Sequence, residues 1–171
     1  MVVATQFDSE VAAHASRVTT LALRIARALG AGPRRLEAIR MGGPLHDIGK
    51  LGVDPEILAK PCALDDDELE QIRTHPEIGA RMIRGRRALR GAVDCVLHHH
   101  ERWDGTGYPR GLGGHEIPFE ARVLAVADAY DAMTSDRPYR PALTHEEAVA
   151  EVERCAGTQF DPQVAQAFLE L

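Results

Sequence analysis

Histidine and aspartate gather at positions whose spacing suits metal binding. The chain has eight histidines, and five stand beside another nitrogen or oxygen donor or one helical turn from it. His46 and Asp47 are adjacent, and adjacent helical side chains diverge by about 100°. One ion cannot easily take both, whereas a bridging Asp47 could touch two ions while His46 binds one of them. Because Leu45 and Ile48 bracket the pair and predict burial, an unpartnered charge there would be costly.

A second group of donors follows an apolar helical stretch. Three consecutive histidines, His98, His99 and His100, lead through Glu101 towards a Gly-rich segment. Solvated histidine runs exist, but this one is internal and short, which favours a role in binding metal or phosphate. Asp128 lies on a predicted helix whose apolar face should be buried, so its carboxylate needs a metal ion or a cationic partner.

Other candidate positions carry weaker signals. Glu10 and His14 are four residues apart and share a helix face, although such pairs are most often exposed and hydrogen-bonded. His75 precedes Pro76, which disfavours helical geometry at His75 and would direct its imidazole towards a pocket. Asp131 is interpreted as a helix-capping or supporting group.

Arginine dominates the basic residues, and lysine occurs only at Lys50 and Lys60. Arg137 and Arg140 fall at a predicted helix end, where two guanidinium groups could hold a phosphate or form surface ion pairs. The net charge of -6 argues against a broad nucleic-acid surface but allows a local site for a small anion. The three cysteines form no CxxC motif, and no segment approaches the roughly 18 apolar residues of a membrane span. These features predict a cytoplasmic protein that is not inserted in a membrane.

Helical periodicity indicates the elements that position these residues. After Ser9, a predicted N-cap, apolar residues recur every three to four positions up to Gly30. A second helix is predicted from Pro33, with a break at Gly42-Gly43-Pro44 just before the adjacent His-Asp pair.

Later boundaries are marked by caps, prolines and glycines. Helix starts are predicted at Asp65 with Glu68, at Pro118, at Thr144 with Glu147, and at Asp161-Pro162. Residues 102–117 are rich in glycine and are predicted to form an ordered loop. Strand alternation is nearly absent, so the expected fold is all-α, a bundle of about seven helices. A single domain is expected over 1–171, with residues 1–8 flexible.

These motifs together resemble the HD-GYP phosphodiesterases, a subgroup of the HD superfamily that hydrolyses cyclic dinucleotides. The resemblance runs nearly end to end. It covers His14 with Arg17, His46-Asp47-Ile48-Gly49-Lys50, His75-Pro76, His99-His100-Glu101-Arg102, Asp104-Gly105-Thr106-Gly107-Tyr108-Pro109, Asp128, Asp136-Arg137-Pro138-Tyr139-Arg140 and Phe160-Asp161-Pro162. His98 and the glycines before His46 depart from the family pattern.

The resemblance implies an HD-domain bundle with a Gly-rich GYP loop and a two-ion centre bridged by Asp47. The implied ligands are His46, Asp47, His75, His99, His100 and Asp128. Glu10 and His14 match a pair that extends the centre to a third ion in some members. The implied catalytic residues are Asp47 and Lys50, and the implied substrate contacts are Lys50, Tyr108, Arg137 and Arg140. Iron or manganese is expected, and zinc, nickel or cobalt would also suit nitrogen and oxygen donors.

By the same resemblance the substrate is cyclic di-GMP, and the products are linear pGpG, GMP or both. Two ions could lower the pKa of a bridging water and, with Lys50, stabilise charge in the transition state. One alternative is an HD phosphohydrolase acting on another nucleotide such as cyclic GMP-AMP. Another is a catalytically silent cyclic dinucleotide sensor that signals through a partner. A regulatory domain or partner protein and a homodimer are further expectations.

Overall fold

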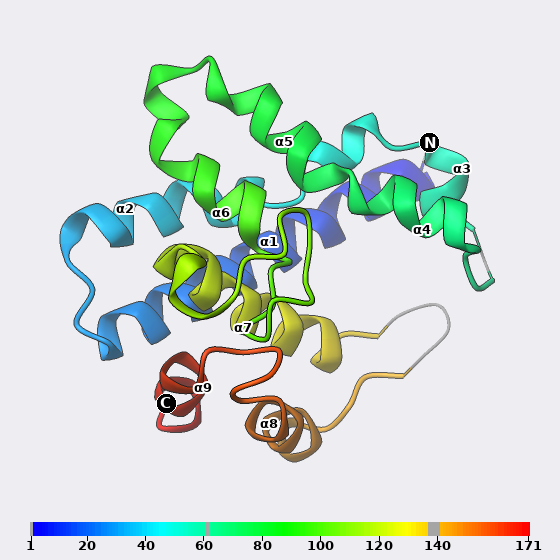
Figure 1. Cartoon of the computed structure of the whole chain (residues 1–171). Helices are drawn as coiled ribbons and strands as arrows, with labels where there is room; N and C mark the ends of the chain where they lie inside the picture. Colours follow the sequence, from blue (N-terminus) through cyan, green and yellow to red (C-terminus); the bar gives the residue numbers. More distant parts are fainter. Residues whose placement is uncertain (1, 61, 137–140) are drawn as a thin grey trace.

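The computed structural model describes residues 2–60, 62–136 and 141–171. Within these ranges the chain is helical, with two isolated β-bridges and no strand, which confirms the all-α prediction (Figure 1). The α-helices are α1 (Val2–Ala28), α2 (Pro33–Gly42), α3 (Pro55–Leu58), α4 (Asp66–Arg73), α5 (His75–Arg84), α6 (Val93–His98), α7 (Phe119–Thr134), α8 (His145–Arg154) and α9 (Pro162–Leu169). The 3₁₀ helices are η1 (Gly43–Leu45), η2 (Ile48–Gly52), η3 (Arg87–Ala92) and η4 (Gly114–Glu116). The described ranges contain nine α-helices, against the predicted bundle of about seven, and one of them, α3, has only four residues and is too short to show apolar periodicity.

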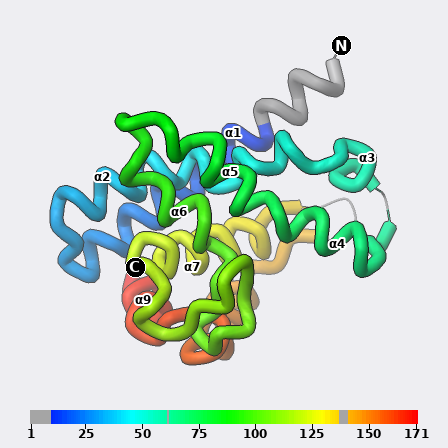
Figure 2. The backbone as a smooth tube through the Cα atoms, turned by 45° about the horizontal axis from the view of Figure 1, so that its top comes forward, coloured from blue at the N-terminus to red at the C-terminus, as the bar shows by residue number. Residues whose placement is uncertain are grey.

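Helices α1 and α7 pack against each other at the centre of the bundle. Helices α5 and α6 lie on one side of this pair, and α8 and α9 lie on the other (Figure 1, Figure 2). The shared core contains Val18, Ala22 and Ile25 of α1, Val123, Val126 and Ala127 of α7, and Val164 and Phe168 of α9. Among the described residues, no helix has the length and apolar character needed to cross a membrane.

Helix α1 begins at Val2, so the N-cap predicted at Ser9 was wrong. Residues 2–8 belong to this helix, and the expectation that residues 1–8 are flexible stays a prediction. Neither glycine nor proline occurs in this stretch, and a serine caps a helix only where the preceding chain leaves helical geometry. The helix ends at Ala28, two residues before Gly30, whose positive φ of 70° suits a helix stop.

The predicted break before His46 is confirmed, because α2 ends at Gly42 and η1 follows as a tighter turn. Both glycines in this turn meet neighbouring helices closely. A Cβ on Gly42 would lie 2.4 Å from the Cβ of Cys95 on α6, and a Cβ on Gly43 would lie 2.3 Å from Oγ1 of Thr19 on α1. The absence of side chains therefore lets this turn sit against both helices.

A single residue, Thr74, separates α4 from α5, and its φ of -78° and ψ of -17° are helical. His75 is the first residue of α5, so the prediction that Pro76 excludes it from helical geometry was wrong. Proline is tolerated in the first turn of a helix, where its missing N–H would have had no partner. The ring of His75 is fixed by the carbonyl oxygen of Ile72, 2.7 Å from Nδ1.

The remaining boundaries follow the predicted signals. Both predicted capping boxes, starting at Asp65 and Thr144, form their reciprocal hydrogen bonds, and the side chain of Asp161 caps α9. Pro118 is the N-cap of α7. Residues 102–117 form a loop that contains only the short η4 and runs from α6 past α7 towards α8 and α9 (Figure 1).

Close packing of η2 on α5 leaves Gly49 no room for a side chain. A Cβ there would lie 1.8 Å from the carbonyl oxygen of His75 and 2.6 Å from the backbone nitrogen of Gly79. We expect Gly49→Ala to lower the free energy of unfolding by about 2 kcal/mol or more, because backbone on one side must move. Urea and thermal unfolding measure this change. Gly85→Ala is the control, since Gly85 has a φ of -72° and no atom near its Cβ position; equal stability of the two variants would contradict the packing argument.

Candidate metal centre

Separate parts of the chain bring donor atoms together. His14 lies on α1, His46 and Asp47 lie between η1 and η2, His75 begins α5, and His99 and His100 directly follow α6. The donor atoms form two groups, each within 4.8 Å: Asp47 with His75, His99 and His100, and Asp47 with His14 and His46. Asp47 belongs to both groups, which is the arrangement expected of a carboxylate that bridges two ions.

The two oxygens of Asp47 face different neighbours. Oδ1 lies 3.2 Å from Nε2 of His75 and 3.9 Å from Nε2 of His99. Oδ2 lies 3.4 Å from Nε2 of His46 and 2.6 Å from Nζ of Lys50. Each oxygen therefore serves one group, and the lysine contacts the shared carboxylate directly.

Asp128 of α7 adjoins the second group. Its Oδ1 lies 3.4 Å from Nε2 of His14 and 3.8 Å from Nε2 of His46. The structure thus brings together all six residues that were predicted as ligands of a two-ion centre. His14, which was predicted with Glu10 for a third ion, lies in the second group. Glu10 is exposed and belongs to neither group.

Backbone carbonyls orient the imidazoles. Nδ1 of His46, His75 and His99 lies 2.6, 2.7 and 3.0 Å, respectively, from a carbonyl oxygen three residues earlier. A carbonyl can only accept, so each Nδ1 carries a hydrogen, and Nε2 is the ring nitrogen that faces the other donors. Nε2 of His46 and Oδ1 of Asp47 are buried without a hydrogen-bond partner in the described part of the chain. Buried acceptors in this state fit a bound cation.

Burial and charge set the protonation states of these residues. Burial lowers the pKa of His100 to about 4 and lowers the pKa of His99 well below its ordinary value, so both stay neutral. Burial also opposes charge on His46 and Asp47, but the attraction between Nε2 of His46 and Oδ2 of Asp47, which lie 3.4 Å apart, outweighs it. The pKa of His46 rises to about 9, and that of Asp47 stays far below its usual range, so a bound ion would have to displace the proton on Nε2 of His46. The pKa of Asp128 is lowered too, by its contact with His14 against the effect of burial, so both carboxylates stay ionised.

A buried carboxylate on α7, Asp131, orients His14. Its Oδ2 lies 2.7 Å from Nδ1 of His14, and it accepts hydrogen bonds from Nε and a terminal nitrogen of Arg17 at 2.5 and 2.9 Å. The carboxylate holds the hydrogen on Nδ1 and leaves Nε2 of His14 facing Asp128. This matches the supporting role predicted for Asp131. Sequence reasoning gave Arg17 no role, although its place one turn after His14 was an available signal.

The Gly-rich loop places Tyr108 against the donor groups. The tyrosine ring stacks on His100, with centroids 4.9 Å apart and planes at 27°, and the guanidinium carbon of Arg73 lies 5.8 Å from the tyrosine centroid. Burial raises the pKa of Tyr108 above its usual range, so its hydroxyl stays neutral. Arg137 and Arg140, which were predicted to contact substrate, lie outside the described residues.

Comparison with known proteins identifies the family. Residues 4–164 match the HD domain family. The chain belongs to this family. A cyclic di-GMP phosphodiesterase of Thermotoga maritima is 43% identical to this HD domain over 166 residues, covering 96% of this chain and 45% of that protein. A 3'3'-cGAMP-specific phosphodiesterase of Vibrio cholerae is 35% identical, covering 94% of this chain and 31% of that protein.

The fold of the HD domain is also found among solved structures. Bd1817, an HDG"Y"P protein from Bdellovibrio bacteriovorus, superimposes with a TM-score of 0.76 at 21% identity, covering 94% of this chain and 51% of that one. This likeness concerns the fold alone. The chain spans less than half the length of the two curated relatives named above. The comparison of sequences shows that the chain belongs to the HD domain family, and the structure shows a His/Asp cluster able to bind metal ions.

Metal content tests the shared carboxylate. We expect the protein to bind two divalent ions, Asp47→Ala to retain neither tightly, and His14→Ala to retain one, because Asp47 serves both groups and His14 serves one. Dialysis against Mn²⁺ followed by elemental analysis measures the stoichiometry. Asp94→Ala, an exposed carboxylate on α6, should keep both ions. Full occupancy in Asp47→Ala would contradict the bridging assignment.

Support of His14 by Asp131 can be tested separately. Asp131→Asn keeps the size of the side chain but removes the charge that holds the Nδ1 hydrogen of His14. We expect the affinity for one of two Mn²⁺ ions to fall by about ten- to a hundredfold, the usual effect of losing a partner behind a metal ligand. Calorimetric titration of the metal-free protein measures both affinities, with Asp94→Asn as the control. Two unchanged affinities would show that His14 needs no such support.

Proposed function

We propose that this HD domain is a metal-dependent phosphodiesterase that hydrolyses the 3',5'-phosphodiester bonds of cyclic di-GMP. The observation that carries the proposal is the carboxylate of Asp47 between two groups of imidazole donors. The name of the Thermotoga maritima relative, which matches nearly the whole chain, supports the choice of substrate.

Two metal sites are proposed on either side of Asp47. One would use Asp47, His75, His99 and His100, and the other would use His14, His46, Asp47 and Asp128. Iron or manganese is proposed for both sites, and zinc, nickel or cobalt would accept the same nitrogen and oxygen donors. When bound, such ions supply Lewis acidity and make water a better nucleophile near neutral pH.

The chain's own residues bind and orient the substrate. Lys50 has a partly exposed ammonium group beside Asp47, where it can neutralise negative charge on a phosphate oxygen. The neutral ring of Tyr108 lies beside His100, where it can support a base or donate its hydroxyl to a phosphate. We also assign Arg137 and Arg140 to phosphate contacts on the family resemblance. Cleavage of one phosphodiester bond gives linear pGpG, and cleavage of the second gives GMP.

A mixed cyclic GMP-AMP ring is the second candidate substrate. The relative from Vibrio cholerae carries a name specific to 3'3'-cGAMP and matches this chain over a similar extent. Imidazoles and carboxylates act on the phosphodiester and do not distinguish guanine from adenine, so the donor groups favour neither ring. A silent sensor is less well supported, because all six predicted ligands are present and placed together.

Turnover of purified, Mn²⁺- or Fe²⁺-loaded protein tests the proposal. We expect chromatography to detect pGpG or GMP from cyclic di-GMP, with slower turnover of 3'3'-cGAMP. Asp47→Ala should lose more than about a hundredfold in rate, because even partners behind a ligand cost ten- to a hundredfold. Asp94→Ala should match the parent. If metal-bound protein hydrolyses neither cyclic dinucleotide, the proposed phosphodiesterase activity is refuted. Faster turnover of 3'3'-cGAMP than of cyclic di-GMP would overturn the substrate assignment.

A further inference from the structure

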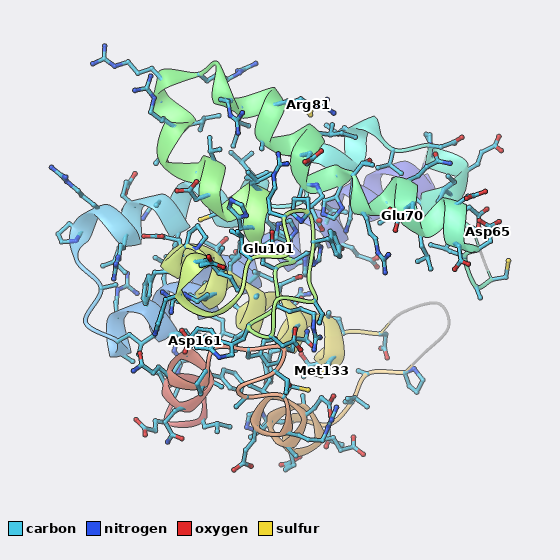
Figure 3. All side chains as sticks on the ribbon, in the orientation of Figure 1. Asp65, Glu70, Arg81, Glu101, Met133 and Asp161 are labelled. Atoms are coloured by element: carbon cyan, nitrogen blue, oxygen red, sulfur yellow. The ribbon has the colours of Figure 1, made fainter. Side chains whose placement is uncertain are left out.

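Glu101 follows the metal-site histidines directly, yet its carboxylate faces the Gly-rich loop. It lies just after the end of α6, at the start of that loop, near the middle of the view in Figure 3. Only 3% of the residue is exposed. Oε1 accepts a hydrogen bond from the backbone N–H of Arg110 at 2.8 Å, and Oε2 accepts one from the N–H of Leu112 at 3.1 Å. These donors flank Gly111, whose φ of 64° turns the chain.

The position of this carboxylate calls for a role other than metal binding. Its oxygens belong to neither donor group, although the sequence places Glu101 next to His100. A buried carboxylate is tolerated only when charged or polar partners satisfy it. Here two backbone amides from residues nine and eleven positions later supply the short contacts, and Nδ1 of His98 adds a longer one to Oε1 at 3.5 Å. The side chain therefore closes the loop onto the end of α6.

The part of the loop that contains Tyr108 packs against residues 100–102, the segment that includes Glu101. The backbone N–H of Tyr108 donates to the carbonyl oxygen of His100 at 3.2 Å. Gly107 is so close that a Cβ on it would lie 2.3 Å from the backbone nitrogen of Arg102 and 2.7 Å from Cα of Glu101. Tyr108 is thus held between backbone contacts to residues 100–102 and the carboxylate bonds of Glu101 to residues 110 and 112.

We propose that Glu101 is a positioning residue that fixes Tyr108 beside His100, so that substrate affinity depends on it while metal binding does not. The inference rests on the proposed function for its link to substrate. The placement of the loop is a separate physical property, which can be measured without turnover.

Glu101→Gln is the central variant. Glutamine keeps the shape, but its amide replaces one acceptor with a donor, so one of the two backbone N–H groups loses its partner. We expect trypsin to cleave after the exposed Arg110 about tenfold faster in the metal-loaded protein, because opening of the loop becomes easier. The KM for cyclic di-GMP should rise roughly three- to tenfold, since only molecules with the loop in place present Tyr108. Bound Mn²⁺ and kcat should stay within about twofold of the parent.

Glu116→Gln is the matched control. Glu116 is an exposed glutamate on the same loop, and its contact with the N–H of Gly113 is long at 3.4 Å. This variant should resemble the parent in tryptic cleavage, metal content and KM. Circular dichroism on all variants shows whether the helices are retained. A cleavage rate after Arg110 that is as fast in Glu116→Gln as in Glu101→Gln would overturn the specific role of Glu101.

A double-substitution cycle tests whether Glu101 acts through Tyr108. Tyr108→Leu removes the ring, so adding Glu101→Gln to it should raise KM no further. Additive losses, a loss of Mn²⁺ in Glu101→Gln, or unchanged cleavage after Arg110 would each overturn the inference. If the parent hydrolyses no cyclic dinucleotide, the proposed function fails, while cleavage after Arg110 and metal content still decide the placement of the loop by Glu101.

Discussion

A partly buried carboxylate surrounded by imidazoles, that of Asp47, is the constraint on which this fold depends. Asp47 stays ionised, and its oxygens face two sets of imidazole ring nitrogens. Several acceptors held together in a poorly solvated site repel one another, and Lys50 contacts only one of the two Asp47 oxygens, so a further cation among the donors would relieve this repulsion. The surrounding helices must therefore hold these donors in place against that repulsion. The packing of α1 on α7 and of η2 on α5 holds the segments that carry these donors.

Irregular backbone makes this placement feasible. Adjacent residues of a regular helix diverge too far for His46 and Asp47 to face one centre, and the turns η1 and η2 remove this restriction. Glycine permits these turns to lie directly on their neighbours, as Gly43 does on α1 and Gly49 does on α5. The long α1 and the well-packed α7 then supply rigid supports from which His14 and Asp128 reach the same region.

Residue types and local order predicted most of this arrangement. The helix class, the capping boxes and the break before His46 follow from patterns that act within a few residues, whereas the set of six donors was implied by the family resemblance. The conformation at His75 could not be predicted, because the bias against helix before proline is weak compared with packing of α5 on η2. The location of His14 also depended on distance across the bundle, which no local pattern contains. The contact between Arg17 and Asp131 could not be predicted for the same reason, because the two residues are 114 positions apart in the sequence.

The loop that carries Tyr108 connects the metal centre with parts of the chain far from it. Its start is continuous with His100, but the backbone N–H groups of Trp103 and Asp104 donate to the carbonyls of Gln159 and Thr158, in the connection between α8 and α9. The last two helices contribute no donor to the metal groups, yet they help to place the loop. The ligand set can therefore stay constant while changes in this distant connection shift the loop. Relatives named for different cyclic dinucleotides match this chain over nearly its whole length, and under the proposed function a loop placed separately from the metal groups would accommodate both substrates.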